Sequence, residues 1–199
     1  MASLSKLMHL LLQEAPTIGF GLRSIGHGDG QAFGLAMCRG DITSSACTAC
    51  IHEANDHILH HCPFEKEATV WLEHCLVRYA DREFFGEIDD IRKFYVADST
   101  NVSQIPVLDA KVEELMERLV KRAYLTPLLF ATGEIELGTV GSLFGLVQCT
   151  RDLSGGDCRR CLNAALAELP RGSHGGRGGS VFGGSCNIRY ELYPFYDSS

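Results

Sequence analysis

Apolar residues recur with the period of an α-helix at the start of the chain and again near its middle. The first stripe, within residues 4–14, consists of Leu4, Leu7, Met8 and Leu11. The second, within residues 109–124, consists of Val112, Leu115, Leu119 and Ala123. Spacings of three and four residues place these side chains on one helix face, so each stripe predicts an amphipathic helix. A signal peptide is the alternative for the first segment, although Gln13 and Glu14 interrupt its apolar patch and no A-x-A-like site follows.

Short apolar runs punctuated by glycine follow each stripe and predict strands. They are residues 19–25, 31–38, 69–72 and 76–79 in the first half, and 128–132, 143–148, 181–182 and 187–193 in the second. A Gly-Asp-Gly turn at residues 28–30 would join the first two runs. Ser44 or Ser45 would cap a helix that ends near His61, because Pro63 prevents it from continuing, and residues 156–169 predict a matching helix. Each half of the chain is therefore predicted to contain two helices and an antiparallel sheet, which is an α+β fold.

Cysteine spacing indicates that the two halves of the chain are copies of one domain. The pattern C-x8-C-x2-C, followed by a cysteine 25 residues later, occurs twice with an offset of 111 residues. Its members are Cys38, Cys47, Cys50 and Cys75, and then Cys149, Cys158, Cys161 and Cys186. Other residues that keep this offset include Arg78/Arg189 and Phe84/Phe195. We therefore predict tandem domains at residues 1–88 and 106–197, joined by a linker at residues 89–105.

Two features lie in the expected linker. Residues 94–96, Phe-Tyr-Val, suit a strand that leads the second copy, and the first copy has no counterpart because the chain begins at its first helix. Asn101 opens the N-glycosylation sequon Asn-Val-Ser. Together with a repeated cysteine pattern, a sequon fits a secreted protein.

Composition argues against two classes of protein. The net charge is −7, whereas a phosphate-binding scaffold needs clustered Lys and Arg, so we expect no nucleic-acid partner. No apolar run approaches the roughly 18 residues that cross a bilayer. The chain as given should therefore contain no membrane span.

The repeated cysteines could hold zinc, act in redox chemistry or form structural disulfides. Zinc-binding C-x2-C pairs normally lie about 15 to 20 residues apart, whereas a whole domain separates the two C-x2-C pairs of this chain, which argues against zinc. A redox C-x2-C pair normally lies in a βαβ unit, which is absent from the predicted elements. Helical cysteines at i and i+3 are neighbours that are unsuited to bonding each other, so each should reach a different strand. The simplest pairing is Cys38–Cys47, Cys50–Cys75, Cys149–Cys158 and Cys161–Cys186. Each bridge would add roughly 2.5 to 3.5 kcal/mol to the free energy of unfolding of its domain.

Cys62 is the ninth and odd cysteine, and Ser173 stands at the matching position of the second copy. An odd cysteine in a secreted chain indicates a missing or external partner. We expect that partner on a leading strand upstream of this chain, together with a signal peptide. As given, the first copy should expose an unpaired sheet edge and leave Cys62 unbridged.

Candidate catalytic and metal-binding patterns are weak. His52 and His57 lie five positions apart, one more than H-E-x-x-H requires, so they point to different helix faces. His57 and His61 could share a metal ion, but the helix dipole explains histidines at a helix C-terminus equally well. The Gly-rich residues 171–184 lack the G-K-[ST] ending of a phosphate loop and predict an ordinary loop. We therefore expect no enzyme activity, no cofactor and no metal site.

Residues 34–41 (GLAMCRGD), 149–161 (CTRDLSGGDCRRC) and 185–195 (SCNIRYELYPF) resemble the plant stress-antifungal domain, also called the ginkbilobin-like domain. The resemblance covers nearly the whole chain. Tandem copies are similar to the ectodomains of cysteine-rich receptor-like kinases, to secreted cysteine-rich repeat proteins and to plasmodesma-located proteins. The resemblance implies two helices on a five-stranded antiparallel sheet in each copy. It also implies a third bridge from a first-strand cysteine to the position of Cys62.

Some single-domain members of that family bind mannose through an Asn after the first cysteine, an Arg six residues before the last cysteine and a Glu five residues after it. The second copy has Ser180 and Glu191 at the last two positions, the first has Thr69 and Ala80, and the leading cysteine and Asn are missing from both. The candidate remnant of a carbohydrate site is therefore Glu191, with Arg177 three residues from the Arg position.

The resemblance implies a function as well as a fold. It indicates a non-catalytic protein that is secreted to the plant apoplast and acts in stress or defence through a protein partner at the cell surface. The alternative is a mannose-binding antifungal protein, whose ligand would be a carbohydrate.

Overall fold

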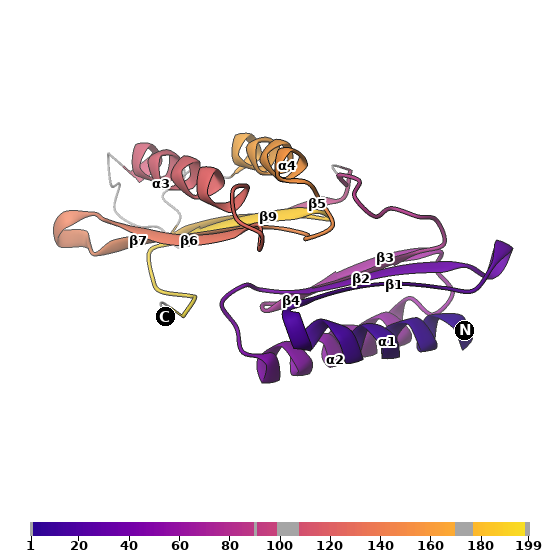
Figure 1. Ribbon diagram of the computed structural model, residues 1–199. Coiled ribbons are helices and arrows are strands. Elements are labelled where there is room, and N and C mark those ends of the chain that lie inside the picture. The colour runs from indigo at the N-terminus through magenta and orange to yellow at the C-terminus, as the bar shows by residue number, and fades with distance from the viewer. Residues whose placement is uncertain (1, 90, 99–107, 170–176, 198–199) are drawn as a thin grey trace. The chain divides into compact units, whose positions relative to one another are not determined.

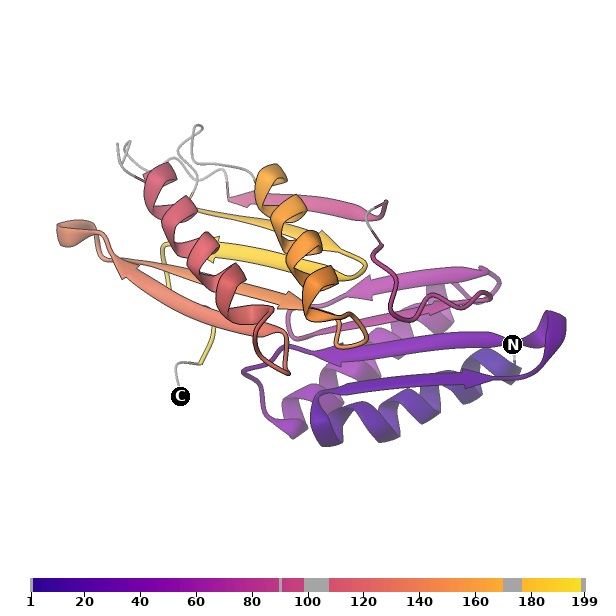
Figure 2. The ribbon, with the colours of Figure 1, turned by 45° about the horizontal axis from the view of Figure 1, so that its top comes forward.

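The computed structural model describes residues 2–89, 91–98, 108–169 and 177–197 (Figure 1). Contacts between residues divide the chain into two units, Met1–Phe85 and Gly86–Ser199. In each unit two helices pack on one face of an antiparallel sheet, as Figure 2 shows from a second direction. This confirms the predicted α+β fold of two tandem copies.

The first unit contains a four-stranded sheet. Its elements are α1 (Ala2–Ile18), β1 (Phe20–Ile25), β2 (Ala32–Cys38), α2 (Ser44–His61), β3 (Glu67–Trp71) and β4 (Cys75–Ala80). The strands are antiparallel in the order β1-β2-β4-β3. Within the described residues β3 therefore forms an edge of this sheet, as expected for a copy that lacks its leading strand.

Two details of the first unit differ from the prediction. α1 continues through Pro16 to Ile18, because a proline in the last turn removes only one hydrogen-bond donor from the helix. The residue that caps α2 is Thr43, not Ser44 or Ser45, since the Thr43 hydroxyl accepts a hydrogen bond from the backbone N–H of Ala46 at 3.3 Å.

The second unit adds a fifth strand to the same plan. Its elements are β5 (Lys93–Asp98), α3 (Leu108–Ala123), β6 (Phe130–Glu136), β7 (Ser142–Cys149), α4 (Gly155–Glu168), β8 (Gly178–Gly183) and β9 (Cys186–Glu191). The strand order is β5-β8-β9-β7-β6. β5 confirms the strand predicted at residues 94–96, and because it pairs antiparallel with β8, the second sheet begins inside the segment that we expected to be a linker. The other predicted domain boundaries stay a prediction.

In the Gly-rich residues 171–184 the strand predicted at residues 181–182 is confirmed, but it begins earlier than expected and replaces part of the predicted loop. Gly178–Gly183 is the strand β8, which lies between β5 and β9 in the sheet. Glycine is needed at Gly178, because a Cβ atom there would overlap the carboxylate of Glu191 on the neighbouring strand. Residues 170–176 lie outside the described part of the chain.

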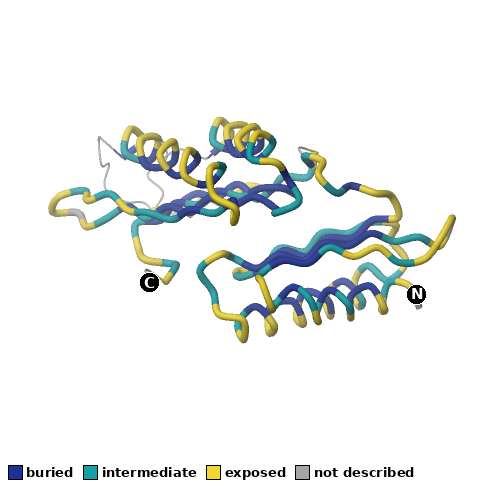
Figure 3. The backbone as a smooth tube through the Cα atoms, viewed as in Figure 1, coloured by how far each residue is buried: buried dark blue, intermediate teal, exposed yellow. Residues whose placement is uncertain are grey.

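The main core of each unit lies between its helices and its sheet, where Figure 3 shows the buried backbone facing inward. Fully buried side chains of the first unit include Leu7, Met8, Leu11, Ile51 and Ile58. Those of the second include Leu115, Met116, Leu119 and Leu143. The helical stripes recognised in the sequence therefore supply much of both cores.

A glycine sets the distance between α1 and β2. A Cβ atom at Gly34 would lie 2.9 Å from Cδ1 of Leu11 and 3.0 Å from Cδ2 of Leu7. Both leucines are fully buried, so neither has room to move aside. Gly145, at the matching position of the second unit, would meet Cδ1 of Leu119 at 2.8 Å. Close approach of helix and sheet at this glycine is thus common to both units.

We expect Gly34→Ala to lower the free energy of unfolding of the first unit by about 1–3 kcal/mol, because the added methyl group overpacks a filled core. Trp71 is the only tryptophan of the chain and lies on β3, so its fluorescence during urea unfolding reports on this unit. Gly30→Ala is the matched control, because a Cβ atom there meets nothing within 4 Å. Equal stability of the two variants would contradict this account of Gly34.

Candidate functional site

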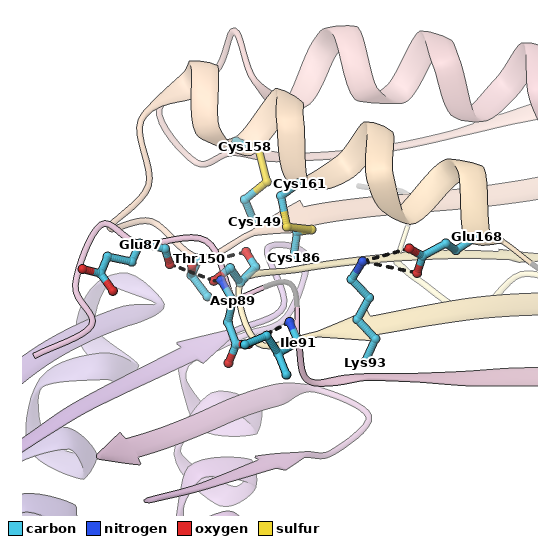
Figure 4. Close-up of a disulfide and its surroundings, with 11 residues drawn as sticks. Glu87, Asp89, Ile91, Lys93, Cys149, Thr150, Cys158, Cys161, Glu168 and Cys186 are labelled. Carbon is cyan, nitrogen blue, oxygen red and sulfur yellow. Dashed lines mark hydrogen bonds and ion pairs between the residues drawn. A yellow bond between two sulfur atoms is a disulfide. The ribbon is translucent and has the colours of Figure 1, made fainter. Parts of the chain in front are cut away.

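Two disulfides tie one helix to the two central strands in each unit. The bridges are Cys38–Cys47, Cys50–Cys75, Cys149–Cys158 and Cys161–Cys186. Cys47 and Cys50 leave α2 from adjacent turns and reach the end of β2 and the start of β4, where Cys38 and Cys75 are register partners. Figure 4 shows the same arrangement at α4. This is the simplest pairing expected from the sequence, and it fixes each helix at one end of its sheet.

Cys62 is a free cysteine and is half-buried. It directly follows α2, and its backbone carbonyl accepts a hydrogen bond from the hydroxyl of Tyr79 at 2.9 Å. The same hydroxyl is 3.0 Å from the carbonyl oxygen of Glu65, and burial raises the pKa of Tyr79 to about 12. Tyr79 therefore holds the segment after α2 in place without involving the thiol.

The second unit holds the candidate carbohydrate residues on neighbouring strands. Ser180 on β8 is the register partner of Arg189 on β9, and Glu191 lies two residues beyond Arg189. Because side chains at i and i+2 of a strand share a face, Arg189 and Glu191 meet, with Nε of Arg189 2.9 Å from Oε1 of Glu191. Both Ser180 and Glu191 are buried. The carboxylate is therefore turned toward Arg189 and is not presented to solvent.

Arg177 immediately precedes β8 and is exposed. Its backbone carbonyl accepts a hydrogen bond from the amide of Leu192 at 2.9 Å, which places its main chain next to the end of β9. In the first unit the corresponding positions are Thr69 on β3 and Ala80 on β4, neither of which carries a charge. The sequence-predicted residues thus share one region of the second unit, in which the Glu191 carboxylate is engaged by Arg189.

An arginine stacked on a phenylalanine was missed by the sequence reasoning. The guanidinium carbon of Arg189 lies 4.3 Å from the ring centre of Phe195, and that of Arg78 lies 4.0 Å from the ring centre of Phe84. Such contacts stabilise by about 0.5–2 kcal/mol, more when desolvated. The signal was present, because both the arginine and the phenylalanine keep the offset of 111 residues.

The edge strand β5 is held by side chains as well as by its backbone. Nζ of Lys93 lies 3.0 Å from Oε1 of Glu168 on α4, as Figure 4 shows, and the hydroxyl of Tyr95 donates to Oε2 of Glu168 at 2.6 Å. These hydrogen bonds, first from Tyr95 and then from Lys93, lower the pKa of Glu168, and the contact raises the pKa of Tyr95. Phe94 and Val96, which flank Tyr95 and point the other way, are 39% and 49% exposed.

Two further expectations concern the surface and the membrane. Asn101, the expected glycosylation site, lies outside the described residues. Among the helices of the described segments, none is long and apolar enough to cross a membrane.

Comparison with known proteins decides the family. A family model described as salt stress response/antifungal matches residues 1–82 and 97–193. The chain belongs to this family. It is 46% identical over 196 residues to an antimicrobial ginkbilobin-2-like protein of Castanea crenata, which covers 98% of this chain and 81% of the relative. It is 42% identical over 196 residues to cysteine-rich repeat secretory protein 38 of Arabidopsis thaliana, covering 98% and 77%.

Solved structures agree on the fold of this stress-antifungal chain. The tandem DUF26 ectodomain of an Arabidopsis thaliana cysteine-rich receptor-like protein superposes with a TM-score of 0.85, covering 97% of this chain and 90% of that one at 24% identity. The predicted family is confirmed by the family model, and the predicted extracellular location is confirmed by relatives that are named as secretory proteins.

Proposed function

We propose that this stress-antifungal protein is a non-catalytic recognition protein of the plant extracellular space, which acts in stress or defence by binding a protein partner. Relatives that are named as antimicrobial and as secretory repeat proteins support the extracellular location and the role in defence. The disulfides support the mechanism, since a stapled helix and sheet present a surface that needs little ordering when a partner binds.

The observation that carries the proposal is the exposed apolar row on β5. Phe94 and Val96 point to the same side of this strand and are 39% and 49% exposed, whereas Tyr95 between them points the other way, toward Glu168. Phe94 stacks on Phe182 of β8 with ring centres 4.8 Å apart, which restrains the Phe94 ring. Rigid aromatic residues on a surface are typical anchors of protein interfaces. We therefore assign the partner-binding role to β5 and the adjacent face of β8.

Mannose binding is the weaker candidate. A sugar site needs several donors and acceptors that converge on one ligand. Here the Glu191 carboxylate is buried and ion-paired with Arg189, and Ser180 replaces the family's arginine. These contacts leave Glu191 poorly placed to accept hydrogen bonds from a sugar.

Site-specific photo-crosslinking tests the protein-binding role. A photoreactive residue at position 96 should capture a discrete apoplastic protein, whereas the same residue at the 75% exposed Leu125 should not. The captured protein, once purified, should bind the natural chain and Leu125→Lys but lose binding to Val96→Lys. Equal binding to the two lysine variants would reject the role of β5. Mannose affinity of about 1 mM or better that depends on Glu191, measured with Glu191→Gln, would favour the carbohydrate alternative.

A further inference from the structure

The solvent-facing side of α2 carries an unusual density of histidine. Four of the chain's eight histidines lie in this helix, namely His52, His57, His60 and His61. With Ala49, Glu53 and Asp56 they line an open hollow of about 600 Å³. The opposite side of α2 carries the buried core residues and both disulfides, so the histidine side faces solvent (Figure 3).

Two of these histidines form a pair one helical turn apart. The rings of His57 and His61 are stacked with their centres 5.7 Å apart. Side chains at i and i+4 point the same way from a helix, so modest rotation of exposed rings can bring one nitrogen of each toward a common point. Oε1 of Glu53 lies 3.9 Å from Nε2 of His57 and places a negative charge beside the pair.

The neighbouring His60 is held in a defined tautomer. Its Nδ1 lies 2.7 Å from the backbone carbonyl oxygen of Asp56, and a carbonyl oxygen can only accept. Nδ1 therefore carries the hydrogen, and Nε2 of the neutral ring keeps its lone pair. A backbone carbonyl that orients a histidine in this way is the usual support of a metal-ligating imidazole.

We propose that His57 and His61 bind one divalent transition-metal ion on the outer face of α2. Imidazole nitrogens favour copper, nickel and zinc, whereas magnesium and calcium require oxygen ligands. Within the described residues no three such side chains converge on one point, so water fills the remaining coordination positions. Glu53 offsets the charge of the ion. This site is independent of the partner-binding role of β5.

The second copy provides an internal comparison. The positions that match His52, Glu53, Asp56, His57, His60 and His61 are occupied by Asn163, Ala164, Ala167, Glu168, Arg171 and Gly172. No histidine is left at this face of α4. One equivalent of metal per chain, and not two, is therefore expected.

Calorimetric titration with nickel(II) at neutral pH tests the site, using protein without a histidine tag. Nickel is the probe because it avoids the oxidation of Cys62 that copper would cause. We expect one bound nickel ion per chain, no binding of magnesium, and weaker nickel binding at pH 5, where protons compete for imidazole. His57→Gln/His61→Gln should reduce the affinity by at least about tenfold, because loss of an outer-shell partner alone costs 10–100-fold.

Two controls make the result specific. His9→Gln/His27→Gln also removes two histidines, both exposed and outside α2, and should bind nickel like the natural chain. Cys62→Ala should do the same. The proposal would be overturned if the natural chain bound no nickel, or if both double variants lost nickel affinity equally. It would also be overturned if Cys62→Ala lost nickel binding while His57→Gln/His61→Gln kept it. All substituted histidines are exposed, and circular dichroism confirms that the variants remain folded.

Discussion

Replacing Cys50 and Cys75 by alanine should lower the free energy of unfolding of the first unit by about 3.5 kcal/mol. The bridge closes a loop of 25 residues, and the chain-entropy relation gives that value for such a loop. A small domain has a net stability of roughly 5 to 15 kcal/mol, so one bridge is a large share of it. Urea unfolding followed by Trp71 fluorescence measures the loss.

The second bridge of the same unit is the matched comparison. Cys38–Cys47 closes only nine residues, for which the same relation gives about 2.6 kcal/mol. Both pairs connect α2 to a strand and all four cysteines are buried, so differences in burial are small. Each variant is made in a Cys62→Ser background, because a free thiol exchanges with disulfides during unfolding. An equal or larger loss for the short loop would contradict the chain-entropy explanation.

Much of the fold was predictable because the cysteine pattern constrains geometry. Cys47 and Cys50 cannot bond each other on one helix, so their spacing required two strand partners, which the structure places at Cys38 and Cys75. The exact repeat then carried that conclusion to the second unit. Core residues followed from helical periodicity, which depends only on local sequence.

The predictions were wrong or incomplete where the structure of a segment depends on pairing with a strand that is distant in the sequence. Consecutive glycines normally indicate a loop, but in β8 they make room for side chains such as Glu191 on β9. The strand predicted at residues 94–96 is confirmed, but its place in the second sheet depends on pairing with β8, about 85 residues later in the chain. Neither pairing can be read from the segment itself.

The role of the candidate carbohydrate site also depends on contacts that the sequence alone does not reveal. The resemblance to the family identifies Glu191 by its position after the last cysteine, whereas its contact with Arg189 is known only from the structure. Whether the carboxylate serves a ligand or a neighbouring arginine depends on burial, which only the fold supplies. The structure places this pair, with 18% and 8% of the two side chains exposed, at the centre of a contact that includes Phe195.

Arg189→Met should therefore lower the free energy of unfolding of the second unit by about 3 kcal/mol. Removal of one partner of a buried ion pair costs about 3–5 kcal/mol, because the remaining charge stays buried, and the partial exposure of Arg189 favours the lower end. Methionine keeps most of the aliphatic volume of arginine, so the substitution removes only the positive charge and the stacking of the guanidinium on Phe195. Urea unfolding followed by circular dichroism, with hydrogen exchange of the β9 amides, measures the loss in this unit.

Glu191→Ala should cost less, because it recreates the arrangement of the first unit, in which Arg78 stacks on Phe84 and residue 80 is alanine. Arg189→Met/Glu191→Ala should be more stable than Arg189→Met alone, since no buried carboxylate then lacks the guanidinium. A double variant that loses the sum of the two single losses would show that the charges act independently. Glu191 would then no longer be engaged by Arg189, and its carboxylate would again be a candidate for a sugar ligand.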